Sequence, residues 1–367
     1  MDERWVAVLG QPDTPTDAVE EYCRYLASAL AAHGTTLEVA RLAWAEEGLR
    51  SGLKSFSGEF PGQKTSWFLL QYTALAWSRR GFPWRFLKVI RRLKRTGARC
   101  AVVFHDAETY FGTRLVDRVR RAVQLHVMRE AWRLADLPIF TIPPAKIPWL
   151  PAAREKTAFI PVGANLPSPE MAWANADVKK PGPPTVAVFS LSEGAVGAEE
   201  VRTIADALLF AAERMGQLRV VVLGRNSEMT RTSLRERMEA APVEVVVHGL
   251  LPANEVAQVL GTCDVMLFVR GPISTRRGSA IAGIACGLPV VGRGGWETAA
   301  PITEAGIALV DAADARGVGP ALLQVLSDDA LRKQLAQRSK QAYERYFSWM
   351  AIAGQFTEVM SRYQHKP

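Results

Sequence analysis

The chain has 367 residues, with 48% hydrophobic and 22% charged side chains and a formal net charge of +8. This length suffices for two domains with separate cores, and the composition excludes a disordered chain. No apolar run reaches the roughly 20 residues that span a bilayer, and the start MDERWVAVLG lacks the basic and apolar regions of a signal peptide, so we expect a cytoplasmic protein, with membrane association left open.

Segments of strand and helix pattern alternate along the whole chain. Such alternation is typical of parallel sheets covered by helices on both faces, so the predicted fold class is α/β with two Rossmann-like, doubly wound domains. In the first domain, residues 1–165, helices are predicted at Asp17–His33 and Asp117–Leu134. The predicted strands are Trp5–Leu9, Thr36–Arg41, Trp67–Gln71, Cys100–Phe104, Leu137–Thr141 and Ala158–Pro161.

The excess of positive charge falls in the first domain. Residues 1–165 contain 24 Lys and Arg against 16 Asp and Glu, whereas the remainder has 21 of each. Much of this charge lies in Arg79, Arg80 and Trp84–Arg99, a segment where basic and apolar residues alternate at helical spacing. The predicted helix has a basic face that is either simply solvated or contacts an anionic membrane or a phosphate-bearing acceptor through Trp84–Arg95. No nucleic-acid motif accompanies the charge, so nucleic acid is not an expected partner.

A polar pair follows the predicted strand Cys100–Phe104. Side chains just after a parallel strand emerge at its carboxyl edge, where ligands bind in doubly wound sheets. His105 and Asp106 are therefore candidate catalytic residues. The alternative is that they cap a helix or bond within the loop.

A proline-rich stretch, Pro167–Pro184, predicts a linker at residues 166–184. The second domain, residues 185–345, has predicted helices at Glu199–Met215, Thr232–Ala240, Ala253–Leu260 and Ala313–Leu326. Its predicted strands are Thr185–Phe189, Arg219–Leu223, Val243–His248, Asp264–Phe268, Leu288–Val291 and Ala308–Val310. The last segment, residues 346–367, carries an apolar stripe and is predicted to cross back and pack on the first domain.

Two strand ends of the second domain carry polar residues. Gly224, Arg225 and Asn226 follow one strand, where the glycine permits close backbone approach and Arg225 is suited to a diphosphate. A surface turn is the alternative. His248 ends the next strand, and its role is either structural or a contact with a nucleobase.

The segment Gly271–Glu297, GPISTRRGSAIAGIACGLPVVGRGGWE, is the most informative stretch. Its pattern predicts a polar loop, a short helix of small residues with Ser279 as N-cap, a strand, and a glycine-rich turn. A helix start beside Arg276 and Arg277 suits a phosphate, because free amides and the helix dipole favour an anion. The alternative is that the small residues only let the helix pack closely on a sheet.

The four cysteines, Cys23, Cys100, Cys263 and Cys286, lie far apart in apolar contexts without C-x-x-C spacing. This pattern predicts buried, reduced thiols and no disulfide or metal site.

Several of these segments together resemble the retaining glycosyltransferases of the GT-B type, family 4 (group 1). Ala282–Val291 (AGIACGLPVV) is similar to that family's EAMACGxPVV run, and Gly294–Glu297 (GGWE) to the turn after it. Cys100–Asp106 resembles its strand ending in His-Asp, Phe159–Asn165 (FIPVGAN) its interdomain strand, and Tyr346–Phe356 (YFSWMAIAGQF) its closing helix.

The resemblance implies a GT-B fold with an interdomain cleft, in which a nucleoside-diphosphate sugar is the donor and the sugar is transferred with retention. No cofactor or metal ion is implied, and the acceptor is a carbohydrate or a lipid-linked molecule. His105 would contact the transferred sugar. The candidate donor-binding residues are Arg225, Asn226, His248, Ser274, Arg276, Arg277, Gly278, Ser279, Gly294, Gly295 and Glu297.

The sequence departs from the family in its donor site. Ser274 and Ala282 stand where the family has two glutamates, Gly10–Asp13 stands where it has paired glycines, and there is no Asp-x-Asp motif. We therefore expect the diphosphate to be held mainly by Arg276 or Arg277 and the helix start. Removing either arginine should weaken binding about 10- to 150-fold.

Two other functions stay open. A sugar-nucleotide epimerase on the same fold would need additional acid or base carboxylates, and Glu297 is the candidate. A degenerate relative would bind a nucleotide or a partner protein without turnover, which fits the missing glutamates.

Overall fold

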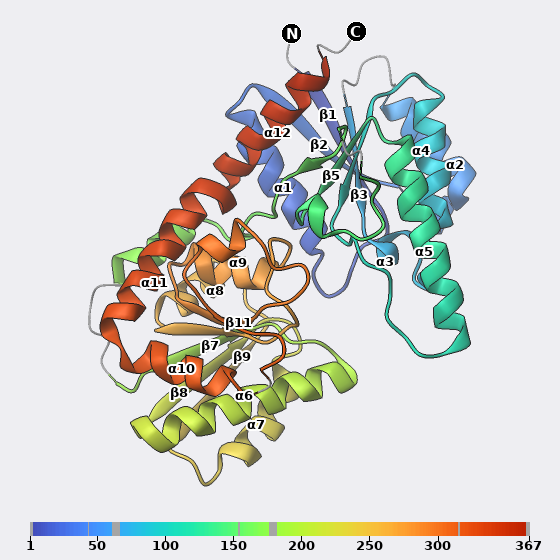
Figure 1. Cartoon of the computed structure of the whole chain (residues 1–367). Helices are drawn as coiled ribbons and strands as arrows, with labels where there is room; N and C mark the ends of the chain where they lie inside the picture. The colour runs from blue at the N-terminus through green and yellow to red at the C-terminus, as the bar shows by residue number, and fades with distance from the viewer. Residues whose placement is uncertain are drawn as a thin grey trace. The chain divides into compact units, whose positions relative to one another are not determined.

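The computed structural model describes residues 3–42, 44–60, 67–152, 155–175, 182–314 and 316–364 (Figure 1). The chain forms two compact units. Unit 1 consists of Met1–Pro161 and Trp349–Pro367, and unit 2 of Val162–Ser348. No helix among the described residues has the length and apolar character needed to cross a bilayer.

Unit 1 is built on a parallel sheet in the order β2-β1-β3-β4-β5-β6. Its strands are β1 Glu3–Leu9, β2 Thr35–Arg41, β3 Trp67–Tyr72, β4 Cys100–Phe104, β5 Leu137–Phe140 and β6 Ala158–Phe159. Every residue of β3 and β4 is buried, because helices cover both faces of the sheet: α1 and α12 lie on one side, and α2, α4 and α5 on the other (Figure 1). The helices of unit 1 are α1 Ala18–Ala31, α2 Trp44–Glu59, α3 Ala74–Trp77, α4 Trp84–Lys94, α5 Leu115–Leu134 and α12 Trp349–Gln364.

Unit 2 has a second parallel sheet, in the order β12-β11-β10-β7-β8-β9. Its strands are β7 Thr185–Phe189, β8 Leu218–Leu223, β9 Val243–Gly249, β10 Val265–Phe268, β11 Val290–Arg293 and β12 Ile307–Val310. The helices are α6 Gly194–Met215, α7 Arg231–Met238, α8 Ala253–Gly261, α9 Gly278–Ala285, α10 Val318–Ser327 and α11 Asp329–Ala342. The α/β fold with two Rossmann-like sheets is thus confirmed.

Three predicted helix starts are wrong. The helix predicted from Glu199 begins earlier, at Gly194. The helix predicted from Ala313 begins at Val318, because Asp311 and Asp314 bind the amides of Ala313 (2.8 Å) and Arg316 (3.0 Å) and form turns instead. Ser279 is not the N-cap of α9. The first helical hydrogen bonds end on the carbonyl of Arg277, so Arg277 is the N-cap and Ser279 lies within the first turn.

The small residues of α9 do let it pack closely on the sheet. A Cβ added to Gly283 would lie 2.2 Å from the sulfur of Met266 in β10, which leaves no room for a larger residue. Gly287 ends the helix with a φ of +73°, a conformation that favours glycine. The start of α9 is therefore held at a fixed place beside the end of β10.

Within the predicted linker, residues 176–181 lie outside the described residues. The preceding residues form a 3₁₀ helix, Pro169–Asn175, that belongs to unit 2, where the indole of Trp173 donates to the carbonyl of Ala285 at 2.8 Å.

Helix α12 belongs to unit 1 and packs on α1 (Figure 1). Its first residue, Trp349, stacks on Tyr25 of α1 with ring centroids 5.5 Å apart. The side chains of its apolar stripe are buried at Ile352, Phe356 and Met360.

All four cysteines are buried and unpaired, as predicted. Burial raises the pKa of Cys100 and of Cys286 to about 12, so both thiols stay protonated at neutral pH.

Candidate functional site

In unit 2, the strand order reverses between β7 and β10. Ligands of open α/β sheets bind at the carboxyl ends of strands beside such a switch point. Three residues here have a left-handed backbone: Ser190 after β7 (φ 63°), and Gly224 (φ 86°) and Asn226 (φ 62°) after β8. Non-glycine residues rarely adopt this conformation, and such residues gather at functional sites. This edge of the sheet is therefore the candidate site.

The loops after β7 and β8 are tied to each other. The amide of Arg225 donates to the hydroxyl of Ser190 (3.3 Å), and the side-chain amide of Asn226 donates to the carbonyl of Leu191 (2.8 Å). Asn226 was predicted to contact the ligand, but its side-chain NH₂ group is used to hold the loop after β7. Glu200 of α6 is buried and accepts from both the amide and the hydroxyl of Ser192, each at 2.7 Å. The site is built on a preorganised frame.

The structure brings Arg276, Arg277 and Glu297 together. The carboxylate of Glu297, only 1% exposed, accepts from Nε of Arg276 at 2.5 Å, from Nη2 of Arg276 at 3.3 Å, and from Nη2 of Arg277 at 3.0 Å. Both oxygens of Glu297 are therefore occupied. The two arginines were predicted to bind a diphosphate directly, and that role stays a prediction. In the structure they hold the loop before α9 against the turn after β11.

Arg270, in the loop after β10, is a candidate site residue that the sequence analysis did not name. Its Nε is buried and has no hydrogen-bond partner among the described residues. Burial lowers the pKa of Arg270, Glu200 opposes this shift, and Arg225 adds to it. Burial is also the main cause that lowers the pKa of Arg277, with smaller effects from Arg276 and Arg270. Four arginines, Arg225, Arg270, Arg276 and Arg277, thus lie close enough to affect one another's charge, with Glu200 and Glu297 among their acidic neighbours.

The remaining predicted donor residues differ in burial and packing. Ser274 is fully buried and its hydroxyl has no partner among the described residues, whereas a Cβ added to Gly278 would meet open space. Gly295 packs on Pro272, since an added Cβ would lie 2.6 Å from that ring. Gly294 precedes it in the same turn, and His248 is exposed in β9. Ala282, at the second missing glutamate, is buried.

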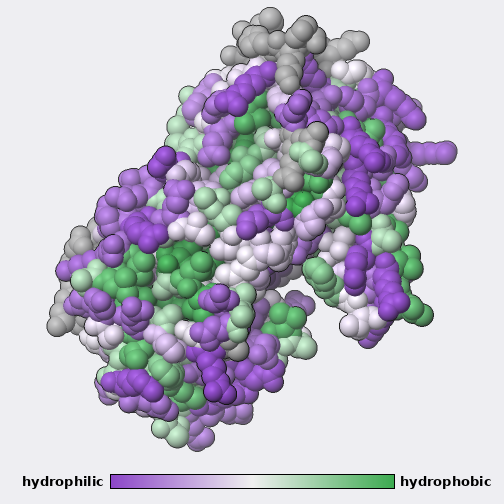
Figure 2. Space-filling view, viewed as in Figure 1, coloured by the Kyte–Doolittle hydropathy of each residue, from purple (hydrophilic) through white to green (hydrophobic). Residues whose placement is uncertain are grey.

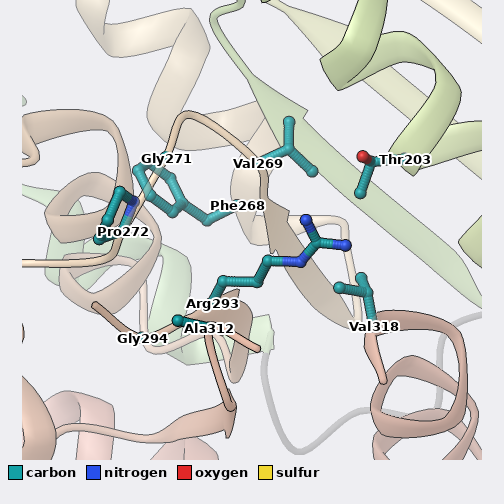
Figure 3. A pocket seen from close by; sticks show the side chains of 9 residues that line it. All are labelled: Thr203, Phe268, Val269, Gly271, Pro272, Arg293, Gly294, Ala312 and Val318. Atoms are coloured by element: carbon teal, nitrogen blue, oxygen red, sulfur yellow. The ribbon is translucent and has the colours of Figure 1, made fainter. Parts of the chain in front are cut away.

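A small cavity lies next to the loop after β10. It has a volume of about 250 Å³, and the side chain of Arg293 extends into it between Thr203, Val269 and Val318 (Figure 3). Ligand pockets are usually about 300–1,000 Å³. This cavity is therefore suited to a small group rather than to a whole nucleotide.

In unit 1, His105 lies at the carboxyl edge of the sheet, after β4. Its Nε2 lies 2.8 Å from Oε1 of Gln71, a buried residue of β3. Because the amide nitrogen of Gln71 donates to the carbonyl of Leu69 (3.2 Å), its oxygen faces His105. Nε2 of the neutral ring is therefore the donor, which leaves Nδ1 as an acceptor.

The surroundings of His105 keep the ring neutral. Burial lowers its pKa to about 4, although Asp17 at the start of α1 opposes the shift. The edge-to-face ring of Tyr22, 5.0 Å away, contributes to the burial, and Asp17 is itself bound by Arg41 at 2.9 Å. At neutral pH, His105 is thus an acceptor and not an acid. Asp106 follows it and is half-buried.

The low pKa of His105 predicts a loss of stability in acid. The unfolded chain takes up a proton near pH 6.5, whereas the folded chain does so only near pH 4. The contribution of His105 is therefore complete above pH 6.5 and is lost as the pH falls towards 4. Thermal unfolding at pH 7.5 and 5 should show a smaller drop in Tm for His105→Gln than for the parent. The control His33→Gln, at an exposed histidine, should behave like the parent.

Two doubly wound parallel sheets, each with polar residues at its carboxyl edge, define the GT-B class of fold. No family model and no curated protein matches the sequence. Among solved structures, sucrose-phosphate synthase from Thermosynechococcus elongatus is 18% identical with a TM-score of 0.70, and the match covers 98% of each chain.

A glycosyltransferase from Rickettsia africae is 14% identical with a TM-score of 0.66, over 100% of both chains. The Anabaena protein HepE in complex with UDP-glucose is 14% identical with a TM-score of 0.65, over 98% of this chain and 99% of that one. The chain therefore has the GT-B glycosyltransferase fold.

Proposed function

We propose that the protein is a retaining glycosyltransferase that moves a sugar from a nucleoside-diphosphate sugar to an acceptor. The observation that carries this proposal is the gathering of four arginines, Arg225, Arg270, Arg276 and Arg277, at the switch point of unit 2. The GT-B fold, shared with a protein whose structure holds UDP-glucose, supports it.

The chemical task in such a transfer is to stabilise the leaving diphosphate. Arg270 and Arg225 would bind it, Arg276 and Arg277 would hold the loop through Glu297 and add charge, and the amides at the start of α9 would complete the site. In unit 1, Nδ1 of His105 would accept a hydrogen bond from a sugar hydroxyl. These cationic groups would do the work without a metal ion, so we expect turnover to persist in EDTA. No residue is assigned as a covalent nucleophile.

A degenerate, non-catalytic nucleotide binder is the second candidate. The observation that favours it is the replacement of both family glutamates, at Ser274 and Ala282, neither of which offers a carboxylate. An epimerase is less well supported, because Glu297, its candidate acid, already has both oxygens bound by arginines.

The acceptor class remains part of the proposal, as a carbohydrate or a lipid-linked molecule. The predicted membrane contact of Trp84–Arg95 would have few apolar side chains available to it, because most of those in this helix are buried. In α4 the side chains of Phe86, Leu87, Val89, Ile90 and Leu93 are core residues, and Trp84 alone of the apolar set is exposed, at 43%. The helix offers a basic face rather than an apolar one.

Ligand screening tests the proposal. UDP, GDP or dTDP should raise the Tm, because a ligand at 100 times its Kd stabilises a protein by about 2.7 kcal/mol. The corresponding nucleoside should have little effect, since most of the affinity comes from the diphosphate. The sugar nucleotide that binds is then incubated with and without candidate acceptors and followed by NMR of the anomeric proton. Transfer with retention supports the transferase, epimerisation without acceptor the epimerase, and binding without turnover the degenerate form. A chain that none of these nucleotides stabilises would contradict all three.

A further inference from the structure

Five large apolar side chains lie exposed together in unit 1. They occupy the loop before α5 and its first turns, and their exposed fractions range from 47% to 78%. We call them the α5 entry surface: Tyr110, Phe111, Leu115, Val116 and Val119. Apolar clusters of this kind on a folded protein mark sites of interaction.

The α5 entry surface is exposed because α5 extends beyond its neighbour α4. Trp84, the first residue of α4, packs on His126 with ring centroids 5.3 Å apart. The turns of α5 before His126 therefore have no part of α4 beside them. In Figure 1 this end of α5 projects past α4, and in Figure 2 apolar and hydrophilic residues lie side by side on the same part of the surface.

The surface is held in a defined conformation. The guanidinium of Arg120 lies 4.8 Å from the ring centre of Tyr110 and pairs with Asp117 at 2.5 Å. The amide of Tyr110 donates to the side chain of Gln124 (2.7 Å), which in turn donates to the carbonyl of Gly81 (3.0 Å). These contacts fix the loop and the start of α5 that carry the apolar residues.

The charge around this surface is strongly positive. Residues 79–88 and 108–121 together contain eight Lys and Arg against two Asp and Glu. One of these acids, Asp117, is already paired with Arg120, while Arg114 and Arg118 are exposed among the apolar residues. This combination complements an anionic surface that also accepts apolar side chains.

We propose that the α5 entry surface binds an anionic lipid bilayer. Aromatic and aliphatic side chains insert at the boundary between headgroups and acyl chains, and nearby Lys and Arg side chains are attracted to the anionic headgroups. The same loop begins at His105, so the bound membrane lies at the carboxyl edge that carries the candidate catalytic residue. This membrane is a partner of the transferase proposed above, but its binding can be measured without any turnover.

The test is sedimentation of the full chain with vesicles of phosphatidylglycerol and phosphatidylcholine. The parent should bind anionic vesicles at low salt, bind less at high salt, and bind pure phosphatidylcholine weakly. The double variant Phe111→Ser and Leu115→Ser should bind at least tenfold more weakly. The matched control is Met171→Ser with Met229→Ser, two residues of unit 2 exposed to 76% and 72%, against 71% and 78% for the tested pair. This control should bind like the parent.

Three results would overturn the proposal. One is no binding to anionic vesicles at low salt. Another is parental binding by the double variant; lost binding in Arg85→Glu with Lys88→Glu would then assign the contact to the basic face of α4. The third is that the protein does not bind vesicles and instead forms a concentration-dependent dimer, detected by analytical ultracentrifugation and abolished in the double variant. Circular dichroism confirms that each variant is folded, and a failure of nucleotide binding would leave the vesicle result unaffected.

Discussion

Arg270→Ala should weaken the binding of a nucleoside diphosphate by about 10- to 150-fold, which corresponds to the loss of one charge-assisted hydrogen bond of about 1.5–3 kcal/mol. The reason is that Arg270 stands at the switch point of unit 2 with a buried Nε that has no partner among the described residues. Isothermal titration calorimetry with UDP, or with the diphosphate that the thermal screen selects, measures the effect. Arg270→Lys keeps the charge but loses the planar fork, so it should recover only part of the affinity.

The control for this prediction is Arg219→Ala. Arg219 lies at the other end of the same sheet, where it pairs with Glu244 on the surface at 2.7 Å, so its loss should leave binding unchanged. The nucleoside without phosphates should be insensitive to both variants. Arg276→Ala and Arg277→Ala belong in the same series, since the predicted role of these arginines at the diphosphate also needs a direct test. Parental affinity in Arg270→Ala would remove this residue from the donor site.

Glu297→Ala should lower the free energy of unfolding by about 3–5 kcal/mol, the range seen when one partner of a buried ion pair is removed. The carboxylate is almost fully buried and has two arginine partners that would be left without it. Glu297→Gln keeps the volume but not the charge, and should fall between the parent and Glu297→Ala. Denaturant unfolding gives the change, and hydrogen exchange should show the largest loss of protection in residues 270–298.

A surface pair gives the matched comparison. Glu244→Ala removes the partner of Arg219 in a pair whose side chains are 53% and 37% exposed, so its cost should stay below about 1 kcal/mol. If Glu297→Ala costs no more than Glu244→Ala, the buried cluster is not a structural support of the site.

The fold was largely predictable because buried parallel strands are short apolar runs that a single sequence displays clearly. Runs such as Cys100–Phe104 and Thr185–Phe189 match the observed strands in full. Errors arose where local polar side chains compete with the helix, as at Asp311 and Asp314. Such competition depends on backbone geometry that a residue pattern does not specify.

The site was only partly predictable. Arg276, Arg277 and Glu297 were each named as candidates from a recognisable pattern. Their pairing was not predicted, because Glu297 is 20 or more residues away and the contact exists only in the folded chain. Arg270 carried one signal, a cation two residues after an apolar strand and just before a glycine, and its place at the candidate site depends on the strand order. Gln71, which orients His105, lies in a strand whose apolar pattern predicts only a structural role in the core.

Helix α12 has a consequence for how the protein is made. Unit 2 is one continuous stretch, Val162–Ser348, whereas unit 1 needs Trp349 and the helix behind it to cover Tyr22 and Tyr25 on α1. During synthesis, domains fold as their residues leave the ribosome. The half of the protein translated first therefore cannot finish folding until the last helix has emerged. Until then the apolar face of α1 is open to chaperones, and a chain stopped before Trp349 would lack the ring that packs on Tyr22, the neighbour of His105.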